Sequence, residues 1–144
     1  MTEVDFHFNA PDRLGYACRL LRKAVRKGAR VAVTGPAATI EVLDRLLWTF
    51  EDTEFVPHLR LPPHGASPPP RLQHTPVWLV TEAQHAAHLP VLVNLGDETA
   101  PGFESFERVI EIVDHDPSAR ETARARWRHY QGRGYTIHRH EVGA

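Results

Sequence analysis

The chain has 144 residues, of which 42% are apolar and 24% charged, a composition typical of soluble globular proteins that excludes a collagenous or wholly disordered chain. Its length predicts one domain over residues 1–144, and its net charge of −1 argues against strong non-specific affinity for DNA. No apolar run approaches the roughly 18–20 residues of a membrane span, no secretory signal is recognisable, and the single cysteine, Cys18, excludes an internal disulfide. We therefore expect a cytoplasmic protein without a membrane partner.

The predicted elements alternate between strands and helices. Strands are indicated where apolar residues alternate, as at Val4, Phe6 and Phe8, or run together. Helices are indicated where apolar residues recur every three to four positions. In chain order, the patterns predict a strand at 4–8, a helix at 12–27, a strand at 30–34, a helix at 36–48, strands at 77–81 and 91–95 with a short helix at 82–89 between them, a strand at 109–113, a helix at 117–130 and a strand at 135–138. This order predicts an α/β fold with an open, mostly parallel sheet and helices on both faces.

Residues 57–76 differ in character from the rest of the chain. Seven of them are proline, and no apolar periodicity survives. Because an apolar strand resumes directly afterwards, the segment is predicted to be a Pro-rich surface loop and not a linker between domains.

Open α/β sheets commonly bind nucleotides at the carboxyl ends of their strands. The loop after the first predicted strand contains no glycine, and the loop after the second contains Gly35 but no Gly-Lys-Ser/Thr. Pro36 and Glu41 also fit a phosphate cradle poorly. We expect no cofactor, and a nucleotide-binding α/β enzyme remains the alternative.

Catalytic and metal-binding residue types are present but scattered. None of the three serines has the context of a nucleophile elbow. Among the ten histidines, His85 with His88 and His138 with His140 would each be brought together by local structure, but neither pair has a third ligand nearby in the sequence. We predict no catalytic residue and no metal site.

The last predicted helix is the most informative element. The residues that recur at i, i+4, i+7 and i+8, and so share one of its faces, are Arg120, Arg124, Trp127 and Arg128. Arg126 is expected to add charge nearby. Guanidinium groups bind carboxylates and an indole supplies a flat apolar wall, which favours an acidic peptide that carries an aromatic residue. The other interpretation is a solvated amphipathic helix with Trp127 in the core.

The charge is strongly polarised along the chain. Residues 11–30 carry a balance of +6 and residues 120–144 a balance of +4, whereas residues 31–119 carry −9. Two basic segments at opposite ends of the chain could form one anion-binding face. A direct nucleic-acid-binding module, with phosphate contacts and base stacking, is therefore a second alternative.

An aromatic cluster surrounds the end of the second predicted helix. Its aromatic members are Trp48, Phe50 and Phe55, and the acids between them are Glu51, Asp52 and Glu54. The aromatic residues either cap the core or form an exposed patch, rimmed by acids, that marks a protein partner.

Several short segments, in their order and spacing, carry a family resemblance over nearly the whole chain. They are residues 5–13 (DFHFNAPDR), 46–48 (LLW), 55–58 (FVPH), 91–95 (VLVNL), 106–113 (FERVIEIV), 123–130 (ARARWRHY) and 134–135 (GY). Together they resemble the chi subunit of bacterial DNA polymerase III.

The resemblance implies a three-layer α/β/α Rossmann-like fold without a nucleotide site, and a non-enzymatic accessory of the clamp loader. It implies docking through the psi subunit, and binding of the acidic C-terminal tail of single-stranded-DNA-binding protein, which ends in Pro-Phe. Nucleic acid is then contacted only indirectly. The implied tail pocket contains Arg124, Trp127 and Arg128, with Arg120 and Gly134 beside it. Trp48 and Phe55 are implied to lie on the psi-facing surface, which an XPD-like helicase can also use.

Overall fold

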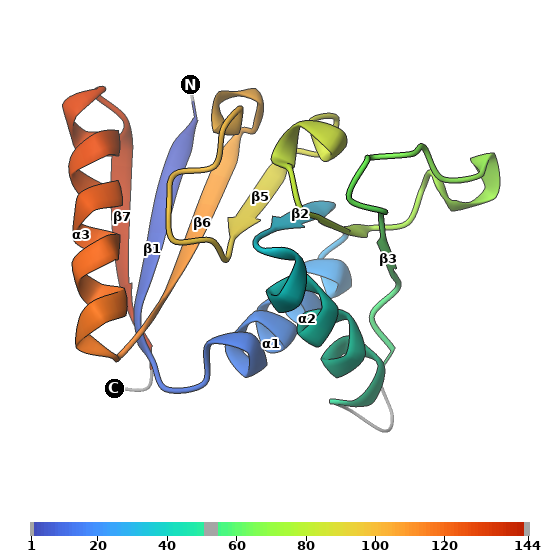
Figure 1. The fold of residues 1–144 in the computed structure, drawn as a ribbon, viewed down its shortest axis with the longest axis horizontal. Helices are drawn as coiled ribbons and strands as arrows, with labels where there is room; N and C mark the ends of the chain where they lie inside the picture. Colours follow the sequence, from blue (N-terminus) through green and yellow to red (C-terminus); the bar gives the residue numbers. More distant parts are fainter. Residues whose placement is uncertain (1, 51–54, 143–144) are drawn as a thin grey trace.

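The computed structural model describes residues 2–50 and 55–142 of the chain (Figure 1). Within them, seven strands, three α-helices and three short 3-10 helices follow one another. In chain order they are β1 (Glu3–Ala10), α1 (Arg13–Arg26), β2 (Val31–Thr34), α2 (Ala37–Thr49), β3 (His58–Arg60), η1 (Pro70–Leu72), β4 (Val77–Val80), η2 (Ala83–Ala86), β5 (Val91–Asn94), η3 (Phe103–Ser105), β6 (Arg108–Asp114), α3 (Pro117–Gly132) and β7 (Thr136–Glu141).

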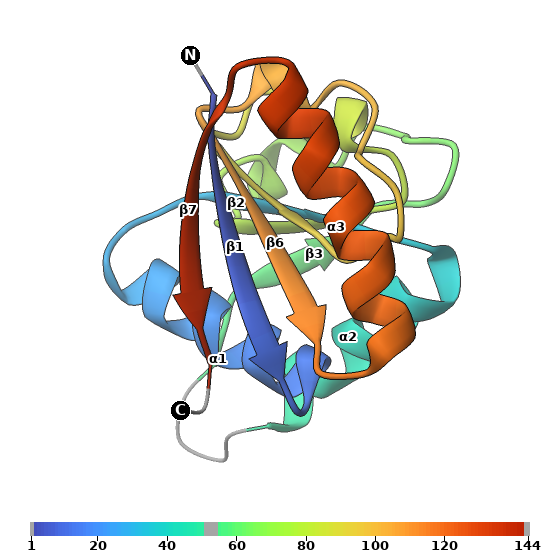
Figure 2. The same ribbon diagram turned by 90° about the vertical axis from the view of Figure 1, so that its left-hand side faces the viewer.

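The strands form one open sheet in the order β3-β4-β2-β5-β6-β1-β7. Every pair of neighbours is parallel, which confirms the predicted fold class. The helices α1 and α2 pack together on one face, and α3 covers the other (Figures 1 and 2). No helix in the described part of the chain has the length and apolar character needed to cross a membrane.

Two apolar clusters, one on each face of the sheet, form the core. Alternation along β1 directs Val4 and Phe6 into the cluster beneath α3. Cys18 and Leu21, on the apolar stripe of α1, are fully buried in the cluster on the opposite face. The recurring apolar residues that indicated the first helix therefore mark the side of it that faces the core.

The segment 57–76, predicted to be a Pro-rich surface loop, contains one short strand. The short strand β3 lies within it and pairs with β4, with His58 opposite Val77. Three residues are too few to show a period of two, and pairing along the sheet edge, which is not encoded locally, stabilises them. The short helix expected at 82–89 is the 3-10 helix η2, and the last strand runs past His138 to Glu141.

The expectation that Arg126 adds charge to the exposed face of the last helix was also wrong. Arg126 is 5% exposed, and its Nε donates to Oε1 of Glu111 at 3.0 Å. Glu111 lies on β6 with no exposed surface, and its Oε2 accepts a hydrogen bond of 2.7 Å from the Tyr130 hydroxyl. The side-chain nitrogen of Asn94 also donates to both carboxylate oxygens. Since a buried carboxylate is unfavourable without partners, Glu111 draws Arg126 and Tyr130 inward.

We expect Arg126→Ala to lower the free energy of unfolding by about 3–5 kcal/mol, because it leaves the Glu111 carboxylate buried without its ion-pair partner. Urea titration followed by circular dichroism measures the change. Arg124→Ala is the matched control, since Arg124 lies exposed on the same helix and its removal should change stability by less than about 0.5 kcal/mol. Equal midpoints for the two variants would contradict the structural role of Arg126.

The loss of stability in Arg126→Ala should depend on pH. Burial raises the pKa of Glu111, and the charge of Arg126 opposes that rise. Without the charge of Arg126, the pKa of Glu111 in the folded state is higher still. The folded variant then keeps a proton on Glu111 at pH values where the same carboxyl in the unfolded chain has lost it. Both proteins lose stability as the pH rises above the ordinary pKa of 4.5, because the pKa of Glu111 is raised in both, but the variant continues to lose it after the unaltered protein has stopped. The deficit of the variant should therefore grow once the pH passes the raised pKa of Glu111 in the unaltered folded protein.

Candidate functional site

A small cavity opens between α3 and the sheet edge formed by β1 and β7. Its volume is about 270 Å³. The side chains that line it are Phe8, Arg120, Arg124, Trp127 and Arg139. We call this group the arginine–aromatic pocket. In Figure 2, α3 and the strands β1 and β7 that carry these residues lie beside one another.

The walls of the pocket follow from helix and strand periodicity. Arg120, Arg124 and Trp127 recur on one side of α3, at right angles to the buried side that holds Arg126. On β1, Phe8 follows Phe6 on the face toward α3. The ring centre of Trp127 is 5.1 Å from that of Phe6 and 6.1 Å from that of Phe8. Trp127 is thus half-buried against the sheet and still lines the pocket.

Arg139 closes the pocket from β7. The parallel register sets Arg139 beside Phe6 on β1, so its side chain lies on the same face as Phe8. Its guanidinium carbon is 4.8 Å from the centre of the Phe8 ring, a cation–π contact. Three guanidinium groups therefore surround an apolar wall made by Phe8 and Trp127.

One carboxylate borders the pocket. Glu141 accepts a hydrogen bond of 2.8 Å from Arg139 and another from the side chain of Asn9. The hydrogen bond from Arg139, and after it the one from Asn9, lower the pKa of the exposed Glu141 carboxyl. In the described part of the chain, Arg120 and Arg124 form no ion pair. Two of the three cations are therefore open to an incoming carboxylate, and the third is shared with Glu141.

The structure brings together only part of the predicted set. Arg120, Arg124 and Trp127 line the pocket, whereas Arg128 is exposed on α3 and is not among its lining residues. Gly134 lies beyond the C-terminus of the helix, outside the lining residues.

Gly134 has a conformational role. Its φ is +82°, and its N–H donates to the carbonyl of Gln131 at 3.0 Å while that of Tyr135 donates to the carbonyl of Tyr130 at 3.1 Å. This Schellman arrangement ends α3 and turns the chain into β7, which carries Arg139.

Phe8 and Arg139 were missed as site residues. Phe8 was part of the alternation that predicts the first strand, and Arg139 lies in the basic segment 120–144. Phe8 and Arg139 are brought together by the pairing of the first and last strands. No local pattern contains that pairing, because the two strands are separated by nearly the whole chain.

The aromatic cluster at the other edge of the sheet is an exposed patch. Trp48, at the end of α2, and Phe55, just before β3, are each 58% exposed, with ring centres 5.2 Å apart. His58 packs against both rings, and the centre of its ring is 4.8 Å from that of Trp48. Nε2 of His58 lies 3.0 Å from Oδ1 of Asp44. We call Trp48 and Phe55 the edge aromatic patch.

The other residues of the aromatic cluster are not part of the edge aromatic patch. Phe50 is half-buried against the core beneath the guanidinium of Arg22. Val42 and Leu46 extend the apolar surface of α2 beside Trp48. The acids Glu51, Asp52 and Glu54, which were expected to rim the patch, lie outside the described residues.

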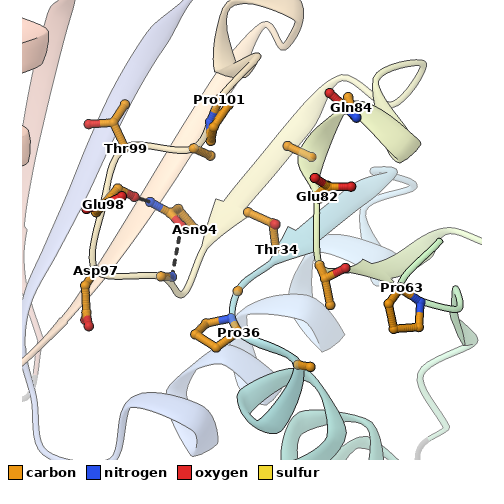
Figure 3. Close-up of a pocket in the computed structure, with 16 residues that line it drawn as sticks. Thr34, Pro36, Pro63, Glu82, Gln84, Asn94, Asp97, Glu98, Thr99 and Pro101 are labelled. Carbon is orange, nitrogen blue, oxygen red and sulfur yellow. Dashed lines mark hydrogen bonds between the residues drawn. The ribbon is translucent and has the colours of Figure 1, made fainter. Parts of the chain in front are cut away.

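A larger cavity, of about 510 Å³, lies at the carboxyl ends of β2, β4 and β5 (Figure 3). Glu82, Asp97 and Glu98 line it, and none of its lining residues is lysine or arginine. Pro36, at the start of α2, has no N–H to offer a phosphate. The position is the usual one for a nucleotide, but the charges oppose an anion.

The two basic segments do not form one face. Residues of α1 lie over one side of the sheet, whereas α3 lies over the other (Figure 2). The sheet separates them, because the crossovers that contain α1 and α3 pass on opposite sides. The prediction that the two basic segments form one anion-binding face was therefore wrong.

Comparisons with known proteins point to one family. The family model described as DNA polymerase III chi subunit, HolC, matches residues 1–138. The chain is 36% identical over 148 aligned residues to DNA polymerase III subunit chi of Pseudomonas aeruginosa, covering 99% of this chain and 98% of the relative. It is 27% identical over 129 residues to DNA polymerase III subunit chi of Haemophilus influenzae, covering 88% of this chain and 85% of that relative.

Proposed function

The chain belongs to the family of DNA polymerase III chi subunits, as its resemblance indicated, and we propose that it is a non-catalytic adaptor that links the clamp loader to the acidic C-terminal tail of single-stranded-DNA-binding protein. Family membership implies a partner within a replication complex. The observation that carries the proposal is the arginine–aromatic pocket, in which three guanidinium groups surround an apolar wall.

The pocket suits the chemistry of a tail that ends in Pro-Phe. The terminal carboxylate and the acidic side chains before it are acceptors for Arg120, Arg124 and Arg139. The terminal phenyl ring is apolar and packs against Phe8 and Trp127. A tail without the ring loses the apolar contact, and a tail without the acids loses the charge-assisted hydrogen bonds.

The second partner binds the edge aromatic patch in this proposal. The psi subunit of the clamp loader, or an XPD-like helicase, covers Trp48 and Phe55 with an apolar surface of its own. Two large aromatic side chains more than half exposed and in contact are typical of an interaction hot spot.

The position of the two surfaces supports an adaptor. The edge aromatic patch adjoins β3, the first strand of the sheet order, and the arginine–aromatic pocket adjoins β7, the last. The whole width of the sheet lies between them (Figure 1). One partner can therefore bind at each edge without contact between the two, and nucleic acid is reached only through the protein that coats it.

A nucleotide-dependent enzyme is less well supported. The cavity at the carboxyl ends of the strands has carboxylates where phosphates need donors. A nucleotide bound there would need a cation to offset these carboxylates.

Arg124→Ala should weaken binding of an acidic peptide ending in Pro-Phe by roughly tenfold to a hundredfold, since one charge-assisted hydrogen bond contributes about 1.5–3 kcal/mol. Isothermal titration calorimetry at low and high salt measures the effect, and the affinity of the unaltered protein should fall as salt screens the charges. Arg71→Ala is the matched control, because Arg71 is an exposed arginine on η1, outside the pocket. Equal affinities for the two variants would remove Arg124 from the site.

Replacing both Trp48 and Phe55 by Ala should abolish binding to the psi subunit, or to the helicase, at concentrations where the unaltered protein is saturated, because each removes a large apolar contact. Analytical gel filtration with each purified partner measures complex formation. Leu72→Ala is the control, since Leu72 is a large exposed apolar residue elsewhere on the surface. Complexes of the double variant that form normally with both partners would show that the patch has another role.

A further inference from the structure

The face of β1 and β7 that points away from α3 carries a group of polar side chains. Because residues alternate along a strand, Asp5 and His7 lie on the opposite face from Phe6 and Phe8. On β7, His138 pairs with Asp5 and His140 pairs with His7 in the parallel register. Two histidines of neighbouring strands, at paired positions, therefore lie side by side with a carboxylate two residues away.

The donor atoms of this group converge. One ligand atom each of Asp5, His7 and His140 lies within 4.8 Å of the others. The ring centres of His7 and His140 are 4.6 Å apart, with an angle of 35° between the rings. Ligand atoms on one tetrahedral zinc ion are about 3.3 Å apart, as follows from Zn–N and Zn–O distances near 2.0–2.1 Å. His140 is exposed, so its side chain is free to rotate toward the other two ligand atoms.

Neighbouring side chains hold two of the three groups in place. Nδ1 of His7 contacts the hydroxyl of Tyr16, on α1. With Nδ1–H donating to that hydroxyl, Nε2 is left with its lone pair directed away from the bond. Oδ2 of Asp5 accepts a hydrogen bond from Arg108, on β6, and a carboxylate has a second oxygen for a cation. Metal-binding histidines and carboxylates are commonly oriented by such hydrogen bonds.

We propose that Asp5, His7 and His140 form a binding site for one divalent transition-metal ion of the zinc type. Two imidazoles and one carboxylate are a donor set that suits zinc and its neighbours in the first transition row, and not magnesium or calcium, which require mostly oxygen ligands. The three protein ligands leave a fourth position for water or for a ligand from another molecule.

The site joins the edge strand β7 to β1. His140 follows directly after Arg139, whose side chain lies on the other face of the strand, in the arginine–aromatic pocket. A bound ion therefore restrains the backbone that positions Arg139. The pair that the sequence singled out, His138 with His140, is not the pair that forms the site, since His140 joins His7 across the strands.

Titration of ZnCl₂ into chelator-treated, dialysed protein by isothermal titration calorimetry tests the proposal. We expect saturable binding of one ion per chain, a rise in melting temperature with Zn²⁺, and visible absorption when Co²⁺ is used in its place. His140→Ala should lose at least tenfold in affinity and lose the rise in melting temperature, because it removes one of three ligands.

His138→Ala is the matched control. His138 lies two residues away on the same face of β7, is also exposed to solvent, and forms a hydrogen bond with Glu3 instead of contacting the group. It should bind Zn²⁺ with unchanged affinity. Circular dichroism and melting without metal confirm that both variants fold like the unaltered protein. Absence of saturable binding, equal affinity in His140→Ala, or an equal loss in His138→Ala would overturn the assignment, since zinc would then bind only to scattered surface histidines.

Discussion

The buried carboxylate of Glu111 fixes the helix on which the rest of the account depends. Because Glu111 lies on a central strand without exposure to water, it requires Arg126 and Tyr130 on the side of α3 that faces the sheet. That requirement sets the rotation of the helix about its axis. Arg120, Arg124 and Trp127 are then turned toward β1 and β7, where an apolar wall and a third guanidinium complete the arginine–aromatic pocket. A residue of the core thus determines which arginines line the pocket.

The chain uses its parallel sheet in an uncommon way. Such sheets often bind ligands at the carboxyl ends of their strands, where this protein has an acidic cavity (Figure 3). Its candidate binding surfaces lie instead at the two edges of the sheet, beside β3 and β7. This arrangement suits a protein that joins two partners.

Local patterns predicted most of the fold and part of the site. The period of the last helix identified Arg120, Arg124 and Trp127 as neighbours, because helical spacing is a local property. Arg126 belongs to the same helix but was misplaced, since its direction is decided by Glu111 on a different element. Phe8, Arg139 and the strand β3 were missed because strand pairing brings together segments that are distant in the sequence. The family resemblance supplied the proposed partners, which no residue pattern alone identifies.

Fluorescence anisotropy with a labelled acidic peptide that ends in Pro-Phe tests the central claim most directly. The control peptide lacks only the final Phe and so keeps the acidic residues. The account predicts saturable binding of the first peptide and its loss with the control, because the apolar wall of Phe8 and Trp127 recognises the terminal ring. Equal binding of the two peptides, or no binding of either to folded protein at moderate salt, would contradict it.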